Sequence, residues 1–276
     1  MSAAVPHLSA KRYTVMVVTA VLVLAASACR REPTRTVRMP LNPPWWQPAV
    51  PLVHSAFSAV LAGGFPLPGE DLDVRRLGYL RAYLAVLADG GPESTPELFS
   101  DQAHVIAYYL NAHMAWAHAL GSAPALRGRP VDALLAEPIR VDRKLTTLAE
   151  LAAKVRAEAT GEPRVELFLN PGWRGGPRLP PSALEGYSLS WQLAAQAQRC
   201  GQAAGFWELH GEAHEVRLSA LVADMRWMPV DPRLRTRRAL DVVPPPPALG
   251  TAILSLCGEQ LQRCSVRFIP IDRSRV

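Results

Sequence analysis

The chain has 276 residues, 49% of them apolar, which excludes a disordered protein and leaves room for a sizeable core. The net charge is +6, and all but three of the 30 basic residues are arginine, a side chain that suits phosphate and carboxylate groups. No basic run is interleaved with aromatic residues, so we expect no nucleic-acid partner.

Residues 1–28 have the pattern of an export signal. Lys11 and Arg12 precede an apolar run from Tyr13 to Ala26, and small residues follow before Cys29. The run is shorter than the ~20 apolar residues of a membrane-spanning helix, so it predicts a cleaved signal peptide. Residues 26–29, Ala-Ser-Ala-Cys, resemble the lipobox of bacterial lipoproteins. An uncleaved signal anchor is the alternative.

The lipobox resemblance implies that Cys29 carries acyl chains, palmitate among them, which anchor the chain in a membrane. We expect a periplasm-facing or surface protein of the cell envelope, and Arg30, which is not Asp, favours the outer membrane. Residues 29–51 are rich in proline and predict an extended tether. Within it, Trp45 and Trp46 predict contact with the membrane or an envelope protein partner, or packing on the domain.

Residues 52–276 predict one mostly helical globular domain. The helix over 100–120, with Ser100 as its N-cap and Gly121 as its stop, is apolar on nearly every face, so we expect it to be central and buried. Other helices are predicted over 52–62, 73–88, 146–159, 182–204 and 249–263, with a helical turn over 219–226.

Fewer segments predict strands. Residues 164–169 alternate in polarity as a strand does, 205–217 predict a short strand pair, and 265–271 predict a C-terminal strand. Residues 121–144 predict a loop, the arginines within 233–238 a solvated loop, and Pro244 to Pro247 a rigid spacer. The prediction is therefore an α+β fold, mostly helical, with a small sheet.

Three cysteines remain in the predicted domain. Cys257 and Cys264 lie on one predicted helix, about 10 Å apart along its axis, which is too far for a disulfide. We therefore expect either a disulfide from Cys200 to one of them or three buried free thiols.

The predicted central helix reads Ala-Tyr-Tyr-Leu-Asn-Ala-His over 107–113. This segment resembles the signature helix of the domain-of-unknown-function 547 family, which runs roughly Ala-Phe-Trp-Ile-Asn-Ala-Tyr-Asn. Later segments follow in the order of that family, so the resemblance covers about 54–276. These segments are Leu145–Arg156, Leu167–Asn170 with Gly172 and Pro177, Tyr187 with Gln192 and Leu193, Val216–Ser219, and Ile271–Ser274.

The chain departs from that family where chemistry would be expected. Ala152 and Ala153 replace a Glu-His pair, Pro171 and Gly176 replace two cysteines, and Met114 replaces a second Asn. A cysteine nucleophile needs a base beside it, and here both are missing. The resemblance thus implies a non-catalytic domain that acts in binding or structural support, without a cofactor or metal.

A remnant pocket is predicted where the glycine-rich loop after Asn170 faces the central helix, because Gly172, Gly175 and Gly176 let the backbone approach a ligand. We expect Asn111 to bond the backbone of this loop. The predicted pocket residues are Asn111, His118, Asn170, Trp173, Arg174, Ser219 and Asp272.

The alternative is a hydrolase or transferase with His104, His118 or His210 as its base, which predicts a cleft with a histidine within ~3 Å of a Ser or Cys. His104 and His118 are too far apart along the helix to share a metal ion. Gly211, between His210 and His214, indicates a hairpin tip rather than a metal motif.

Overall fold

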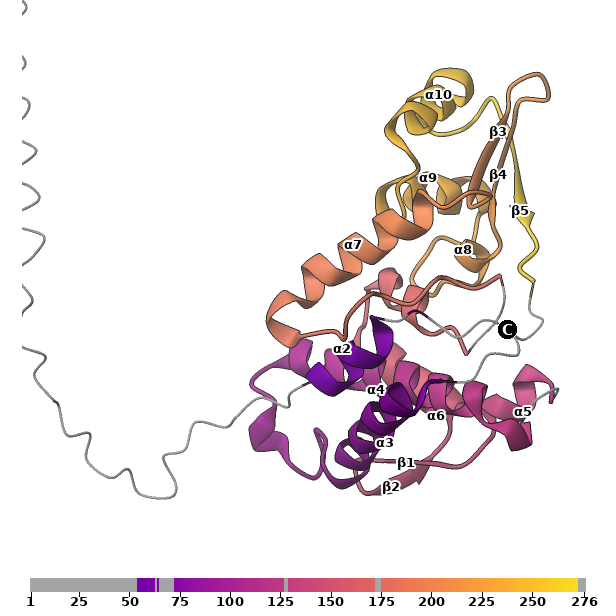
Figure 1. Ribbon diagram of the computed structural model, residues 1–276. Coiled ribbons are helices and arrows are strands. Elements are labelled where there is room, and N and C mark those ends of the chain that lie inside the picture. The colour runs from indigo at the N-terminus through magenta and orange to yellow at the C-terminus, as the bar shows by residue number, and fades with distance from the viewer. Residues whose placement is uncertain (1–53, 63, 65–71, 127–128, 172–174, 273–276) are drawn as a thin grey trace, which may run out of the picture. The chain divides into compact units, whose positions relative to one another are not determined.

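A computed structural model describes residues 54–62, 64, 72–126, 129–171 and 175–272. Helices predominate in this part of the chain, and its strands form two small sheets (Figure 1). The predicted α+β, mostly helical fold is therefore confirmed. The predicted signal peptide and Cys29, Trp45 and Trp46 lie outside the described residues.

The first two helices match their predicted positions. Helix α2 (Ser55–Leu61) packs against α3 (Val74–Asp89). Helix α3 begins after Asp73 because the Asp73 carboxylate accepts a hydrogen bond from the backbone N–H of Arg76 at 2.9 Å. A short 3₁₀ helix, η2 (Pro96–Leu98), leads to the next helix.

Helix α4 (Gln102–Ser122) is the central element, and its predicted burial is confirmed. Between Ala107 and Leu120 only Trp116 and Ala119 are less than fully buried. The predicted N-cap is wrong: Asp101, not Ser100, accepts from the backbone N–H of His104 at 3.0 Å. The predicted stop at Gly121 is also wrong, since the helix continues through Ser122.

The predicted loop over 121–144 contains regular structure: η3 (Pro124–Leu126), α5 (Val131–Leu135) and strand β1 (Ile139–Val141), which pairs with β2 (Lys144–Thr146) in an antiparallel hairpin. Both turn residues, Asp142 and Arg143, have positive φ, at 51° and 62°. Tertiary contacts stabilise this turn, because the Asp142 carboxylate accepts from the backbone N–H groups of Glu93 and Ser94 at 2.8 and 3.0 Å. The turn lacks the Asn-Gly pair that usually marks such hairpins.

Helix α6 (Leu148–Glu158) is confirmed, with Thr147 as its N-cap. The predicted strand over 164–169 is wrong, because this segment is the 3₁₀ helix η4 (Pro163–Phe168). Alternating polarity predicts a strand with one buried face, but here the polar Glu166 is buried along with its apolar neighbours. Arg156 makes that burial possible by donating to both carboxylate oxygens of Glu166 at 2.8 Å.

The second sheet follows the next helix. A 3₁₀ turn, η5 (Gly186–Ser188), precedes α7 (Leu189–Gly201), which is shorter than the predicted 182–204. The predicted strand pair is confirmed as β3 (Trp207–His210) and β4 (Glu215–Ser219), which are antiparallel. The C-terminal strand, β5 (Ser265–Ile269), pairs in parallel with β4, giving the strand order β3-β4-β5.

Three helices connect β4 to β5: α8 (Leu221–Asp224), α9 (Pro232–Val242) and α10 (Pro247–Cys257). The helical turn predicted over 219–226 is α8. The predicted loop over 233–238 is instead part of α9, because Asp231 accepts from the N–H groups of Arg233 and Leu234 at 3.0 and 2.9 Å. The predicted spacer ends at Pro246, since Pro247 is the first residue of α10.

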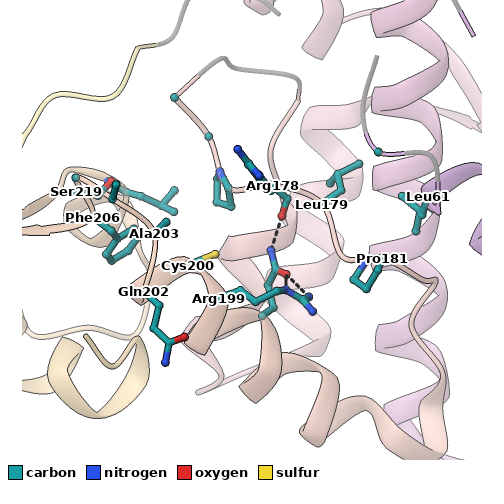
Figure 2. Close-up of a pocket in the computed structure, with 18 of the residues that line it drawn as sticks. Leu61, Arg178, Leu179, Pro181, Arg199, Cys200, Gln202, Ala203, Phe206 and Ser219 are labelled. Carbon is teal, nitrogen blue, oxygen red and sulfur yellow. Dashed lines mark hydrogen bonds between the residues drawn. The ribbon is translucent and has the colours of Figure 1, made fainter. Parts of the chain in front are cut away.

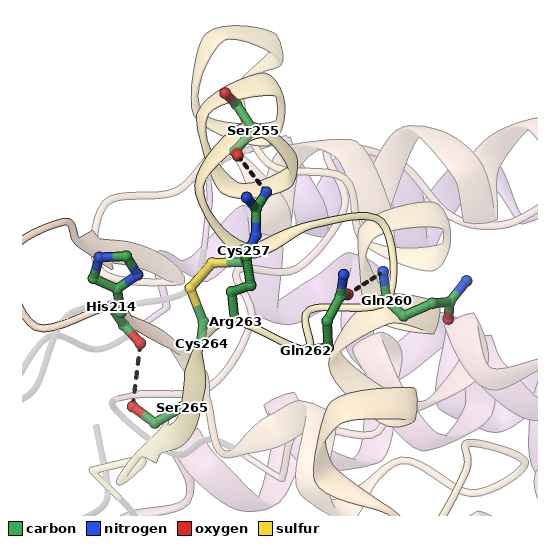
Figure 3. The surroundings of a disulfide bond; sticks show 8 residues. All are labelled: His214, Ser255, Cys257, Gln260, Gln262, Arg263, Cys264 and Ser265. Carbon is green, nitrogen blue, oxygen red and sulfur yellow. Dashed lines mark hydrogen bonds between the residues drawn. A yellow bond between two sulfur atoms is a disulfide. The ribbon is translucent and has the colours of Figure 1, made fainter.

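Cys257 and Cys264 form a disulfide (Figure 3), with their Cα atoms 5.0 Å apart. Both sequence predictions for the cysteines are therefore wrong, since Cys200 is buried and free. The predicted helix over 249–263 ends at Cys257, where Gly258 takes a φ of 81° and reverses the chain. The two cysteines thus do not lie on one helix, so the separation of about 10 Å expected along a shared helix axis does not keep them apart.

Candidate functional site

The two predicted pocket residues on α4 are core residues. Asn111 and His118 are each 0% exposed. The Asn111 side chain donates to the carbonyl of Leu184 and accepts from its N–H, both at 2.8 Å. The predicted bond to the loop near Asn170 is therefore replaced by a pair of bonds to Leu184, and Asn111 fixes the chain just before η5.

The loop after Asn170 closes on itself and on the C-terminal segment. The Asn170 amide donates to the carbonyl of Pro177 at 3.2 Å, and the N–H of Gly175 donates to the carbonyl of Asp272 at 2.9 Å. A Cβ atom at Gly176 would lie 2.2 Å from the Asn170 amide nitrogen, so a larger residue there would displace the Asn170 side chain from its bond to Pro177. Trp173 and Arg174 lie outside the described residues.

A cleft of about 980 Å³ opens beside this loop (Figure 2). Four segments that are distant in sequence line it: the end of α2 with Gly64, residues 175–181, residues 196–206 on and after α7, and Ser219 with Leu221. Its volume is at the upper end of the range for pockets that bind small molecules, about 300–1,000 Å³. Of the predicted pocket residues, Ser219 lines this cleft, whereas Asn170 and Asp272 support the loop that forms one wall.

The cleft lining is apolar apart from a few polar groups. Two arginines, Arg178 and Arg199, line it, and the described lining residues include no aspartate, glutamate, lysine or histidine. Gln196, which is 1% exposed, connects the two arginines. Its amide donates to the carbonyl of Arg178 at 2.6 Å, and its oxygen accepts from Nε and Nη2 of Arg199 at 3.2 and 2.5 Å; these bonds are dashed in Figure 2.

The other candidate reactive groups of the cleft are a thiol and a hydroxyl. Burial raises the pKa of the Cys200 thiol to about 12, so it stays protonated at neutral pH and is a poor nucleophile. The Ser219 Oγ accepts from the N–H of Leu221 at 3.3 Å, at the start of α8. The lining residues that the structure describes include no histidine that could activate either group.

The predicted base His104 has a Ser and an Asp beside it, but not in a catalytic arrangement. The Ser100 Oγ and the Asp101 carboxylate approach the same ring atom, Nδ1, at 3.1 and 2.8 Å. In a catalytic triad the hydroxyl lies on Nε2 and the carboxylate on Nδ1. A Cβ atom at Gly186 would lie 2.4 Å from the ring, so backbone also covers His104. The described contacts of His104 therefore do not form a triad-like nucleophile–base pair.

The other two predicted bases also lack the required surroundings. His118 is buried in the core, where its Nδ1 lies 3.4 Å from the Ser122 Oγ, and it is not among the described residues that line the cleft. His210 lies beside Glu208, with 3.2 Å between its Nε2 and the carboxylate. Within the described part of the chain, no three His, Cys, Asp or Glu side chains lie close enough to hold a metal ion.

No family model, curated protein or solved structure matches this chain. The resemblance to the domain-of-unknown-function 547 family therefore stays a prediction. In the described residues, no helix has both the length and the hydropathy of a membrane span.

Sequence reasoning missed Gln196, Arg178 and Arg199 as cleft residues. Gln196 and Arg199 are three residues apart on a predicted helix, so a shared face was foreseeable. Arginine is common throughout the chain, however, and no local signal separates these two from the others.

Proposed function

We propose that this chain is a bacterial cell-envelope lipoprotein, anchored through Cys29, whose globular domain binds a ligand without transforming it. The observation that carries the proposal is the cleft of about 980 Å³, whose described lining has arginine and apolar side chains but no nucleophile–base pair. Hydrogen-bonding side chains such as Gln196 and Asn170 are used to build the walls.

The disulfide supports the proposed location. Cys257 and Cys264 are buried, and structural disulfides form mainly in oxidising compartments outside the cytoplasm. A chain that is exported through residues 1–28 would meet such a compartment.

Ligand binding in the cleft is tested by a substitution that fills part of it. Ala203 is exposed and lines the cleft, so Ala203→Trp should occupy the space without disturbing the core. Thermal-shift screening of the wild type against sugars, peptides, nucleotides and amphiphiles should yield stabilising compounds that no longer stabilise Ala203→Trp. The matched control is Ala252→Trp, at an exposed position on α10 outside the cleft, and this variant should respond like the wild type.

Two results would overturn the proposal. One is a panel in which no compound depends on the Ala203 position. The other is turnover of an ester, amide or glycoside substrate that disappears in His104→Ala, which would favour the alternative hydrolase or transferase.

A further inference from the structure

We infer that the ligand of the cleft is an amphiphile with an oxyanion headgroup, either a carboxylate or a phosphate, and an apolar tail. This inference rests on the proposed binding function and names the chemical class of the ligand. It is carried by the charge balance of the lining and by the arrangement of its polar atoms.

The charges of the cleft select an anion. Among the described residues that line the cleft, Arg178 and Arg199 are the only ones with a formal charge, and neither makes an ion pair with a described carboxylate. Two guanidinium groups without a carboxylate partner among these residues raise the local potential and attract a negative group. The planar guanidinium also matches the two oxygens of a carboxylate or phosphate better than an ammonium group does.

Arg199 is held in place before any ligand arrives. Its Nε and Nη2 atoms both donate to Gln196, which leaves Nη1 and the remaining Nη2 hydrogen available. Gln196 is itself fixed by its bond to the carbonyl of Arg178 and by its burial. A positioned cation loses less side-chain entropy on binding than a flexible one.

The rest of the lining favours an apolar tail. Apolar side chains in the lining come from Leu61, Leu179, Pro181, Phe206 and Leu221, and three alanines also line the cleft. Figure 2 shows Leu61, Leu179 and Pro181 gathered to one side, and Cys200, Ala203, Phe206 and Ser219 to the other. A hydrophilic ligand such as a free sugar would place hydroxyl groups against this surface, where they would find no hydrogen-bond partners.

The inference is tested by measuring the affinities of four probes by calorimetry. All four have the same ten-carbon chain and are used below their micelle concentrations: decanoate, decyl phosphate, decanol and decyltrimethylammonium. Decanoate or decyl phosphate should bind at least about tenfold more tightly than decanol, and the cation should bind least. Whichever anion binds more tightly distinguishes a fatty-acid source from a phospholipid-like one. Affinity for the anion should fall with ionic strength, because the cleft is open to solvent.

The variants Arg199→Gln and Arg178→Gln should each weaken binding of the anion about tenfold while leaving decanol unchanged. Arg140→Gln is the matched control, because Arg140 is an exposed arginine on β1 outside the cleft and its loss changes the net charge equally. Its affinity should equal that of the wild type.

Equal binding of decanol and the anions, or equal weakening by Arg140→Gln, would overturn the inference while leaving a binding cleft in place. Binding of none of the four probes would also overturn it. The proposed function would then still be judged by the broader panel and the Ala203→Trp variant.

Discussion

At the residue scale, the central helix illustrates how a buried polar side chain is used. Asn111 has both a donor and an acceptor on one side chain, and the backbone of Leu184 needs one of each. The sequence predicts that Asn111 bonds backbone groups, because a polar residue on an apolar helix must find partners, but it wrongly places those groups in the loop after Asn170. Which backbone it meets depends on how the segment after Pro181 folds, and the sequence carries no sign of that.

Histidines behave differently on the same helix. His113 is fully buried, and neither ring nitrogen has a hydrogen-bond partner in the described part of the chain. Burial lowers the pKa of His113 to about 3, and it lowers the pKa values of His54 and His118 to about 4. All three side chains are therefore neutral in the folded protein at physiological pH.

This burial predicts acid sensitivity. The unfolded chain takes up protons on these histidines below pH 6.5, whereas the folded chain does not until about pH 4 or below. Their contribution to stability is therefore complete above pH 6.5 and declines as the pH falls from 6.5 towards 4. In His113→Leu the loss between pH 7.5 and pH 5 should be smaller by about 2 kcal/mol, measured by urea unfolding.

The control for the acid-sensitivity prediction is Met114→Leu, at a fully buried position next to His113 on the same helix, which removes no titratable group and should keep the pH dependence of the wild type. If His113→Leu lost as much stability in acid as the wild type, His113 would not be a buried neutral group.

At the element scale, the disulfide joins the end of α10 to the start of β5. Cys257 is the last residue of the helix, and Cys264 immediately precedes Ser265, the first residue of the strand. Gly258 and the bond from the N–H of Arg263 to the carbonyl of Cys257, at 3.0 Å, turn the chain between them. The disulfide therefore fixes the connection from an apolar helix to the parallel edge strand.

Removing this covalent link should weaken the fold measurably. Cys264→Ser should lower the free energy of unfolding by about 2 kcal/mol, the value expected for a short closed loop. Urea unfolding of the wild type with dithiothreitol should show the same loss, and the variant should no longer respond to the reductant.

Cys200→Ala provides the comparison for the disulfide, because Cys200 is free. This variant should remain as sensitive to dithiothreitol as the wild type. A wild type whose unfolding is unchanged by the reductant would contradict a stabilising disulfide.

At the scale of the whole molecule, the cleft depends on segments that meet only in the folded chain. Gly64, the 175–181 loop, the end of α7 and Ser219 come from four separate parts of the sequence. The proposed lipid anchor would hold this cleft near a membrane, where amphiphiles are concentrated.

Anchoring is tested in the intact chain. Cells that express the wild type should incorporate labelled palmitate into the protein and retain it in the membrane fraction, whereas Cys29→Ala should lose both. Cys200→Ala should behave as the wild type, because its thiol is buried in the folded domain. Palmitate labelling that persists in Cys29→Ala would contradict the lipobox interpretation.

The sequence by itself determined the helices whose own residues supply both an apolar face and a capping side chain, such as α3 and α6, and the local β3–β4 pair. Only the tertiary structure decided the 3₁₀ helix at Pro163–Phe168, the β1–β2 hairpin, the Cys257–Cys264 bond and the cleft. The reason is the range of the forces involved. Caps and helical periodicity act within a few residues. The burial of Glu166 depends instead on its contact with Arg156, and the Asp142 turn depends on its contact with α3. Such contacts form only when the fold brings separate segments together.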